Sequence, residues 1–362
     1  MKIKKLALPV LIIALTFASC KKPKPVPPRG DYDGGYLVLN EGQFMHDNAS
    51  LSFLKKDFSE QEDSVYYKTN NENIGDVGQS LFAEGNKLYI LVNNSNKIIV
   101  ANRWKMNKLG EMASFIKSPR YMVKVSDRKA VVSNWGEVFD SNLQDVEDDF
   151  LAFVNTDSDV VTDTVHIDLG PGKMLYLNGN LYVLISGVSQ SRNEVAVVDP
   201  ASESIQTYLT VGDRPSDIVK DSDDNLWVLS SGNAAWTGNE TPSTISKINP
   251  ATNQVEFTQV IASDKHPQFL FYANGQLYLI MDNKIKSLTA TASSVSLSDV
   301  ADISQDVTTV YGVNVIDDKL FVTDAVDYQQ PGKVVVYDLN NNFAKIGTFV
   351  TGYLPNGVLK NY

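Results

Sequence analysis

Cysteine and histidine are scarce in this sequence of 362 residues. The single cysteine is Cys20, so the chain can form neither an internal disulfide nor a zinc site built from several cysteines. The three histidines, His46, His166 and His266, are widely separated, and the usual hydrolase and nucleotide-binding motifs are missing. The sequence therefore predicts no metal site and no bound cofactor.

Positive charge is also in short supply. The chain has 32 lysines and arginines against 43 aspartates and glutamates, which gives a formal net charge of −11. No basic cluster follows the extreme N-terminus, so nucleic acid is not an expected partner. With 43% hydrophobic residues the chain can still form a substantial core, which excludes wholesale disorder.

The first residues form an export signal. Three lysines precede an apolar run from Leu6 to Phe17, which is too short to span a bilayer comfortably and is followed by Ala18-Ser19-Cys20. We interpret residues 1–19 as a lipoprotein signal peptide, because the sequence before Cys20 resembles a bacterial lipobox. Cys20 is then the lipidated first residue of the mature chain. The alternative is an ordinary signal peptide with an incidental cysteine.

A proline-rich segment follows. Residues 20–34 combine the predicted lipidated cysteine with four prolines in nine positions, KKPKPVPPR, between Lys21 and Arg29. Proline at this density favours an extended, semi-rigid spacer over a packed element. We therefore expect residues 35–362 to be the folded domain, held at a membrane surface by residues 20–34.

The remainder of the chain repeats one pattern. A turn leads into a short strand of aliphatic and aromatic residues, and the matching positions are Leu37, Leu88, Ala130, Leu181, Leu226, Leu277 and Leu320. Prolines precede an apolar strand about ten residues upstream, at Pro119, Pro171, Pro215 and Pro267. Short strands separated by glycine and Asx-Pro turns, four to a unit of about 45 residues, are typical of a β-propeller. The sequence therefore predicts an all-β, seven-bladed propeller.

The two ends of the domain complement each other. The tail from Tyr353 to Lys360 has the form of a proline-led first strand, yet the chain stops before a partner strand. The opening segment Tyr36–Leu39 has no such strand ahead of it. We predict that the C-terminal strand joins the first blade as its innermost strand and closes the ring, since an unclosed ring would leave blade faces exposed.

Long loops on one face are the predicted ligand site. In a propeller the loops between second and third strands share a face with the loops that enter each first strand. In this chain they carry large aromatic residues, which are typical of binding surfaces. The alternative is that these side chains fold back over their own blades. The predicted ligand-binding residues are Asn40, Phe44, Asn94, Arg120, Trp135, Arg214, Trp236, His266 and Tyr328.

Several of these residues have a simpler interpretation. Arg120 and Arg214 suit an anionic group, but both could instead form salt bridges to neighbouring loops. His266 has no predicted second metal ligand, so it is more simply a polar loop residue. The acidic loop Asp140–Asp149 is a weak candidate for a structural calcium, and the run Asp221–Asn225 is interpreted as a hairpin turn.

The lipobox, the spacer, the opening GYLVLNEGQF (Gly35–Phe44) and the seven repeats together resemble the YncE-like β-propeller surface lipoproteins of Bacteroidetes. The nearest functional group is the cobalamin-binding BtuG type. The resemblance implies a lipoprotein of the outer membrane, on the cell surface or facing the periplasm. It also implies a protein that binds a nutrient, a corrinoid or a metal chelate, for a TonB-dependent transporter.

Three functions remain open on the sequence. The first is capture of a nutrient ligand for uptake, with cobalamin-like corrinoids favoured. The second is adhesion or scaffolding through contact with a protein or a glycan. The third is a propeller enzyme, which we do not expect, because such sites need several ionisable side chains converging on the axis. We therefore predict a binding protein rather than an enzyme.

Overall fold

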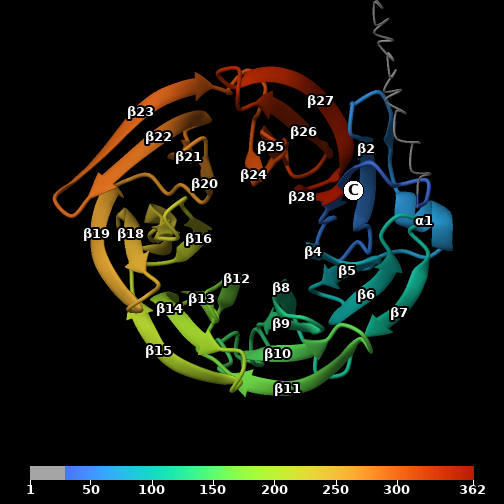
Figure 1. The fold of residues 1–362 in the computed structure, drawn as a ribbon, viewed down its shortest axis with the longest axis horizontal. Coiled ribbons are helices and arrows are strands. Elements are labelled where there is room, and N and C mark those ends of the chain that lie inside the picture. The colour runs from blue at the N-terminus through green and yellow to red at the C-terminus, as the bar shows by residue number, and fades with distance from the viewer. Residues whose placement is uncertain (1–28) are drawn as a thin grey trace, which may run out of the picture.

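The computed structural model describes residues 29–362, so the predicted signal peptide and Cys20 lie outside the described residues, as does most of the predicted spacer. Twenty-eight strands form seven antiparallel sheets of four strands each. Figure 1 shows these sheets arranged as a ring around a central axis. The prediction of a seven-bladed β-propeller is confirmed. No helix among residues 29–362 is long and apolar enough to cross a bilayer.

The blades are built from strands that are consecutive in the sequence, except that the C-terminal strand β28 belongs to blade 1. Within each blade the strands are given from the innermost to the outermost. Blade 1 is β28 (Pro355–Asn361), β1 (Gly35–Asn40), β2 (Ser50–Lys55) and β3 (Gln61–Glu62). Blade 2 is β4 (Gly78–Glu84), β5 (Lys87–Val92), β6 (Lys97–Asn102) and β7 (Lys108–Met112). Blade 3 is β8 (Pro119–Ser126), β9 (Lys129–Asn134), β10 (Phe150–Asn155) and β11 (Val160–His166). Blade 4 is β12 (Pro171–Leu177), β13 (Asn180–Gly187), β14 (Ser191–Asp199) and β15 (Ser204–Thr210).

The last three blades have the same order. Blade 5 is β16 (Pro215–Lys220), β17 (Leu226–Ser230), β18 (Ser243–Asn249) and β19 (Gln254–Ala262). Blade 6 is β20 (Leu270–Ala273), β21 (Gln276–Met281), β22 (Lys284–Thr291) and β23 (Ser294–Asp302). Blade 7 is β24 (Val310–Ile316), β25 (Lys319–Asp324), β26 (Pro331–Asp338) and β27 (Ala344–Tyr353). A helix α1 (Val65–Asn70) joins blades 1 and 2, and a 3₁₀ turn η1 (Ala235–Thr237) lies in blade 5.

The C-terminal strand closes the ring as the sequence predicts. β28 pairs antiparallel with β1, and Val38 lies opposite Val358 in the register. Figure 1 shows the last strands of the chain beside the first ones. Because β28 is the innermost strand of blade 1, the chain ends inside the sheet in which it begins.

One apolar cluster fills each interface between neighbouring blades, seven in all. The seven repeat positions predicted from the sequence all lie in second strands and are all buried. A second strand packs on neighbours through both faces, so Leu88–Val92 is a continuous buried run rather than an alternating one. Tyr36, Val38 and Phe321 belong to the cluster that joins blade 7 to blade 1.

The strand directions define two faces. The loops between second and third strands and the connections between blades lie on one face, which we call the loop face. The hairpins between first and second strands and between third and fourth strands lie on the opposite face, which we call the hairpin face. Residues 29–34 are on the hairpin face, where the amide of Tyr32 donates to the carbonyl of Trp104 in the β6–β7 turn at 2.9 Å.

Candidate functional site

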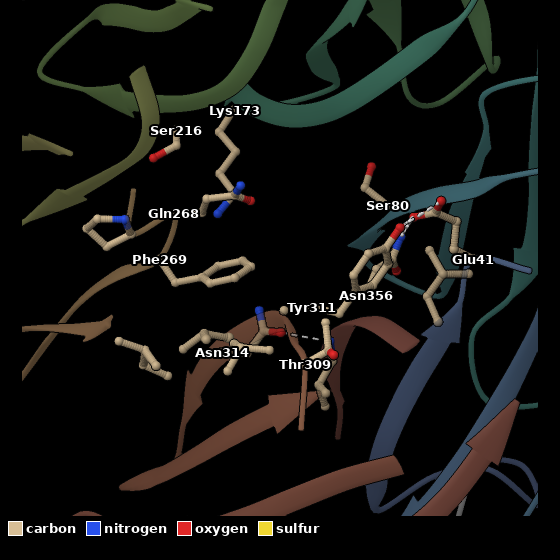
Figure 2. Close-up of a pocket in the computed structure, with 18 of the residues that line it drawn as sticks. Glu41, Ser80, Lys173, Ser216, Gln268, Phe269, Thr309, Tyr311, Asn314 and Asn356 are labelled. Atoms are coloured by element: carbon tan, nitrogen blue, oxygen red, sulfur yellow. Dashed lines mark hydrogen bonds between the residues drawn. The ribbon is translucent and has the colours of Figure 1, made fainter. Parts of the chain in front are cut away.

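A cavity of about 1070 Å³ occupies the central channel. Its walls come from the innermost strands β4, β8, β12, β16, β24 and β28 and from the loop that leads into β20. Figure 2 shows side chains from opposite sides of the ring pointing into the same space, with Lys173 and Gln268 facing Glu41 and Tyr311. This is the size range of pockets that hold small organic molecules.

The local sequence explains how polar side chains reach the channel. Six of the seven innermost strands have a register shift where they pair with the second strand at the loop face, and four of these six begin with proline. Proline has no N–H to donate to the ladder, and a bulge turns the local strand direction. The residues that follow these six starts are Gln79, Arg120, Gly172, Ser216, Tyr311 and Asn356, and Gln268 follows Pro267 in blade 6.

The first polar group in the wall is centred on Glu41, just after β1. The hydroxyl of Tyr311 donates to both carboxylate oxygens of Glu41 at 3.1 Å, and the Nδ2 of Asn356 donates to one of them at 3.3 Å. Burial raises the pKa of Glu41, although Tyr311, Asn356 and the charge of Arg120 act in the opposite direction. Burial and the neighbouring carboxylate raise the pKa of Tyr311, which keeps its hydroxyl a donor. Two innermost strands, β24 and β28, therefore hold this carboxylate in place.

The second polar group lies across the channel. The Nζ of Lys173 is 2.9 Å from a carboxylate oxygen of Asp217, and it lies 5.6 Å from the ring centroid of Phe269. Burial lowers the pKa of Lys173, but the charges of Asp217 and Tyr121 outweigh it, so the pKa is above its ordinary value. Asp217 also accepts the amide of Leu270 at 3.1 Å, so it fixes both the lysine and the entry to β20.

Arg120 lies beside this cavity, since Tyr121 and Ser80, its neighbours in the chain and in space, line the wall although Arg120 itself does not. Its guanidinium stacks on the indole of Trp135, 3.9 Å from the ring centroid, and Ser80 donates to its backbone carbonyl at 2.7 Å. The indole is fixed in turn, because its Nε1 donates to the carbonyl of Pro171 at 3.0 Å. Burial lowers the pKa of Arg120, partly offset by Tyr121, Glu41 and Tyr311. The Nε of Arg120 is completely buried and has no acceptor among the described residues.

Arg214 has a different role from Arg120. Its Nε donates to Asn233 at 2.8 Å, and its two Nη atoms donate to the carbonyls of Val188 and Ser189 at 3.2 and 3.1 Å. The guanidinium therefore joins the loop of blade 4 to the loop of blade 5. The alternative from the sequence was a salt bridge to neighbouring loops. Arg214 does bind the neighbouring loops, but its acceptors are carbonyl and amide oxygens and not a carboxylate.

Two predicted asparagines point away from the cavity. Asn40 is completely buried inside blade 1, where its Nδ2 donates to Ser50 and Ser52 at 3.1 and 3.0 Å. We therefore correct the prediction for Asn40, because its side chain is not accessible to a ligand. Asn94 is exposed, and its Nδ2 donates at 2.5 Å to Asp76, which lies in the connection between blades 1 and 2.

The remaining predicted residues divide into two groups. His266 and Tyr328 line the cavity; the ring of Tyr328 packs edge-on against Tyr311 with centroids 5.9 Å apart. The Nδ1 of His266 is 2.7 Å from the carbonyl of Ser231 and donates to it. Phe44 and Trp236 stand on the loop face outside the cavity wall, with 65% and 86% of their surface exposed. The nine predicted ligand-binding residues therefore all lie at or near the loop face, but only His266 and Tyr328 line the cavity.

The acidic segments contact backbone amides. Asp145 accepts the amides of Ser189 and Gln190, and Asp221 accepts those of Asp223 and Asn225. The turn predicted for Asp221–Asn225 is therefore present. No group of three or more histidine, cysteine, aspartate or glutamate side chains suited to a metal ion occurs within residues 29–362.

Sequence reasoning missed the side chains that form the cavity wall. Glu41 belongs to the opening segment Gly35–Phe44 but was given no role, and Lys173, Tyr311 and Asn356 were not singled out. The available signal was the proline that begins an innermost strand, since the one or two residues after it face the channel. That signal marks Lys173, which follows Pro171 by two positions, and Asn356, which follows Pro355 directly.

A family of unknown function matches most of the folded chain. The model of the family described as "Domain of unknown function (DUF5074)" matches residues 34–273, about two thirds of the sequence. No curated protein sequence matches the chain.

Solved structures of similar fold come from several organisms. The periplasmic gluconolactonase of Pseudomonas aeruginosa has a TM-score of 0.64 at 13% identity and covers 90% of this chain and 98% of its own. A quinonprotein alcohol dehydrogenase-like protein of Bacteroides thetaiotaomicron has a TM-score of 0.63 at 13% identity, over 91% of this chain and 79% of its own. BamB of Moraxella catarrhalis has a TM-score of 0.54 at 9% identity, over 82% and 80%. These likenesses show the fold alone, and they leave open whether the chain is an enzyme.

Proposed function

We propose that this chain, which belongs to the DUF5074 family, is an exported, lipid-anchored protein that captures a small organic ligand at the mouth of its central channel. We propose further that it delivers this ligand to a TonB-dependent transporter of the outer membrane. The observation that supports capture is the cavity of about 1070 Å³, with polar side chains on opposite walls. A cavity of this kind suits one specific ligand better than an extended polymer.

Binding fits the wall better than catalysis does. Glu41 is held by Tyr311 and Asn356, and Lys173 is paired with Asp217, so these ionisable groups are engaged with one another. A general acid or base must instead present its titratable atom to the substrate. We therefore keep the proposal of a binding protein.

A corrinoid is the ligand that we favour, because amide groups surround its macrocycle. The side-chain amides of Gln79 and Gln268 line the cavity without a hydrogen-bond partner among the described residues. The aromatic rings of Phe269, Tyr311 and Tyr328 lie in the same wall. Amides that pair with amides, beside rings that cover an apolar surface, are what such a ligand requires.

Isothermal titration calorimetry of residues 29–362 with cyanocobalamin tests this ligand. We expect saturable heat at micromolar protein, and weaker binding by Gln268→Ala, because that side chain faces the cavity. Trp236→Ala is the matched control, since this exposed side chain lies outside the wall and its loss should leave the affinity unchanged. Absence of heat removes corrinoids as the ligand. A thermal-shift screen of other small molecules then tests capture itself, and a screen without any hit contradicts it.

A second function is favoured by one observation. Phe44, Met45, Phe115, Leu143 and Trp236 are all more than 60% exposed, and all lie in loops of the loop face. Exposed apolar side chains gathered on one face are typical of surfaces that bind another protein or a glycan. In that case Trp236→Ala weakens adhesion to the partner while Gln268→Ala does not, the reverse of the result expected for capture.

A further inference from the structure

Arginines in this protein are almost all engaged by acceptors. The sequence contains six. Arg29, Arg128 and Arg192 form ion pairs with carboxylates, Arg103 donates to Asn361 and to a carbonyl, and Arg214 donates to three loop oxygens. Arg120 alone donates no side-chain hydrogen bond to any residue between 29 and 362. In a chain with a net charge of −11, a mostly buried arginine without an acceptor requires an explanation.

The neighbours of Arg120 fix the orientation of its guanidinium but accept none of its hydrogen bonds, which leaves these donors for a ligand. Stacking on Trp135 fixes the plane of the guanidinium and leaves its edge as the only place where acceptors can bind. The bond from Trp135 to Pro171 fixes the indole beneath it. The Nε of Arg120 is completely buried, whereas its two Nη atoms are not among the buried unpaired atoms and so reach open space.

Arg120 lies at the edge of the cavity, because Tyr121, the next residue in the chain, and Ser80, which donates to the Arg120 carbonyl, both line it. Its charge interacts with Glu41 of blade 1 and with Tyr311 of blade 7, although Arg120 belongs to blade 3. Glu41 and Tyr311 both line the cavity, so the charge of Arg120 acts on groups of the cavity wall. Neither residue forms a hydrogen bond with the guanidinium, because the carboxylate of Glu41 is already held by Tyr311 and Asn356.

We propose that Arg120 is the anion-binding residue of the site, and that the captured ligand carries a singly charged anionic group, a carboxylate or a phosphodiester. This inference rests on the proposed capture function and names the chemistry of its ligand. A guanidinium edge matches the two oxygens of such a group. Glu41 disfavours a second negative charge nearby, so a doubly charged phosphate monoester fits less well. Trp135 acts as a positioning residue.

Titration of ¹⁵N-labelled protein with small anions tests the proposal directly. The complete propeller, residues 29–362, is titrated with acetate, dimethyl phosphate and inorganic phosphate, and the arginine Nε–H signals are followed by NMR. The Arg120 signal is assigned by its loss in Arg120→Lys. We expect it to shift saturably with acetate and dimethyl phosphate, with half-saturation on the order of 10 mM. Inorganic phosphate should bind more weakly at pH 8, where it is doubly charged.

Arg214→Lys is the matched control, because Arg214 also flanks a proline but has its donors occupied. This variant should leave the Arg120 shift unchanged. A shift that is equal for all arginine signals reflects ionic strength and overturns the proposal, as does the absence of saturation by about 100 mM. Equal or tighter binding of the doubly charged phosphate overturns the preference for a single charge.

The same variants separate this proposal from the proposed function. For a ligand found by calorimetry or by the screen, Arg120→Gln should weaken binding about 10- to 100-fold, and Trp135→Ala should do so less strongly. Unchanged affinity in Arg120→Gln overturns the anion site and leaves capture intact. If small anions bind at Arg120 but the screen finds no ligand, the anion site is supported and the proposed capture function is contradicted.

Discussion

At the scale of single residues, Arg120 and Arg214 show how tertiary contacts decide between equal candidates. Both flank the proline of an innermost strand, and the sequence offers the same two interpretations for each. Arg214 precedes its proline and reaches back to the loops of blades 4 and 5. Arg120 follows its proline and lies over Trp135 without an acceptor. The position directly before the proline thus gives Arg214 a structural role, whereas the position directly after it leaves Arg120 for the proposed binding role.

Asp149 supports a prediction on pH dependence. Its carboxyl is completely buried before β10, where one oxygen accepts the amide of Gly170 at 3.1 Å and the other has no partner among the described residues. Burial raises the pKa of Asp149 to about 7, and the charges of Asp148, Asp145 and Glu147 add to the effect. The folded state therefore binds this proton more tightly than the unfolded chain does.

The free energy of unfolding should consequently fall as pH rises from about 4 to 7, since the unfolded carboxyl ionises first. Asp149→Asn keeps the acceptor for Gly170 without the charge. At pH 8 we expect this variant to be more stable than the parent chain by about 1 kcal/mol or more, and at pH 4 by almost nothing. Urea unfolding at both pH values measures the difference. Asp127→Asn, at an exposed carboxylate in a hairpin of the same blade, is the control and should not reproduce this pH dependence; a D149N difference that is equal at both pH values contradicts the assignment.

At the scale of elements, the proline-led innermost strand is the unit that forms the site. Pro119, Pro171, Pro215 and Pro355 each begin such a strand at the loop face, with a register shift where the strand meets its neighbour. The same element also closes the ring, since β28 is the last copy and pairs with the first strand of the domain. One local pattern therefore accounts for both the stability of the ring and the polar lining of its channel.

Removal of residues 355–362 tests the role of β28. The truncation exposes β1 along its ladder edge and takes Val358 out of the apolar cluster between blades 7 and 1. We expect a loss of at least ~3 kcal/mol in the free energy of unfolding, or failure to fold, because burial of each large apolar side chain contributes about 1.5–3 kcal/mol. Thermal unfolding followed by circular dichroism measures the change.

A synthetic peptide of residues 353–362 provides the control for that truncation. Added to the truncated chain, it should raise the melting temperature by pairing with β1, whereas a scrambled peptide of the same composition should have no effect. A truncated chain that melts like the complete one would contradict the closure described for this ring.

At the scale of the whole molecule, both ends of the described chain lie on the hairpin face, while the cavity extends along the channel from the loop face. Residues 29–34 pack on the hairpin face, where the guanidinium of Arg29 lies 3.8 Å from the ring centroid of Trp104. The proposed ligand site opens among the loops of the other face. If Cys20 is acylated as we propose, the loop face is directed away from the anchoring membrane.

Single-cysteine labelling tests this orientation. Cys20 is the only native cysteine, so the acylated protein has no other thiol. A fluorophore at Asp127→Cys, on a hairpin of blade 3, should be quenched by a headgroup-bound quencher more strongly than one at Asn142→Cys, on a loop of the same blade. Fluorescence of the lipidated protein in vesicles measures the two, and the non-lipidated domain is the control. Stronger quenching at position 142 contradicts the proposed orientation.

The sequence by itself determined the number of blades, the seven buried repeat positions and the pairing of the last strand with the first. These features depend on local patterns of strands and turns that recur every 42 to 51 residues, and such patterns can be counted along the chain. The short helix α1 was not predicted, because six residues carry too little periodicity to be recognised.

Only the tertiary structure decided which polar side chains share a cavity. Glu41, Tyr311 and Asn356 come from positions up to 315 residues apart, and no local signal shows that they meet. Asn40 and Arg214 follow the same sequence rules as accessible residues, yet the side-chain donors of both are engaged within the fold. The repeats specify the ring, whereas the contacts across its axis specify the site, because the closure of the ring is what brings distant strands together.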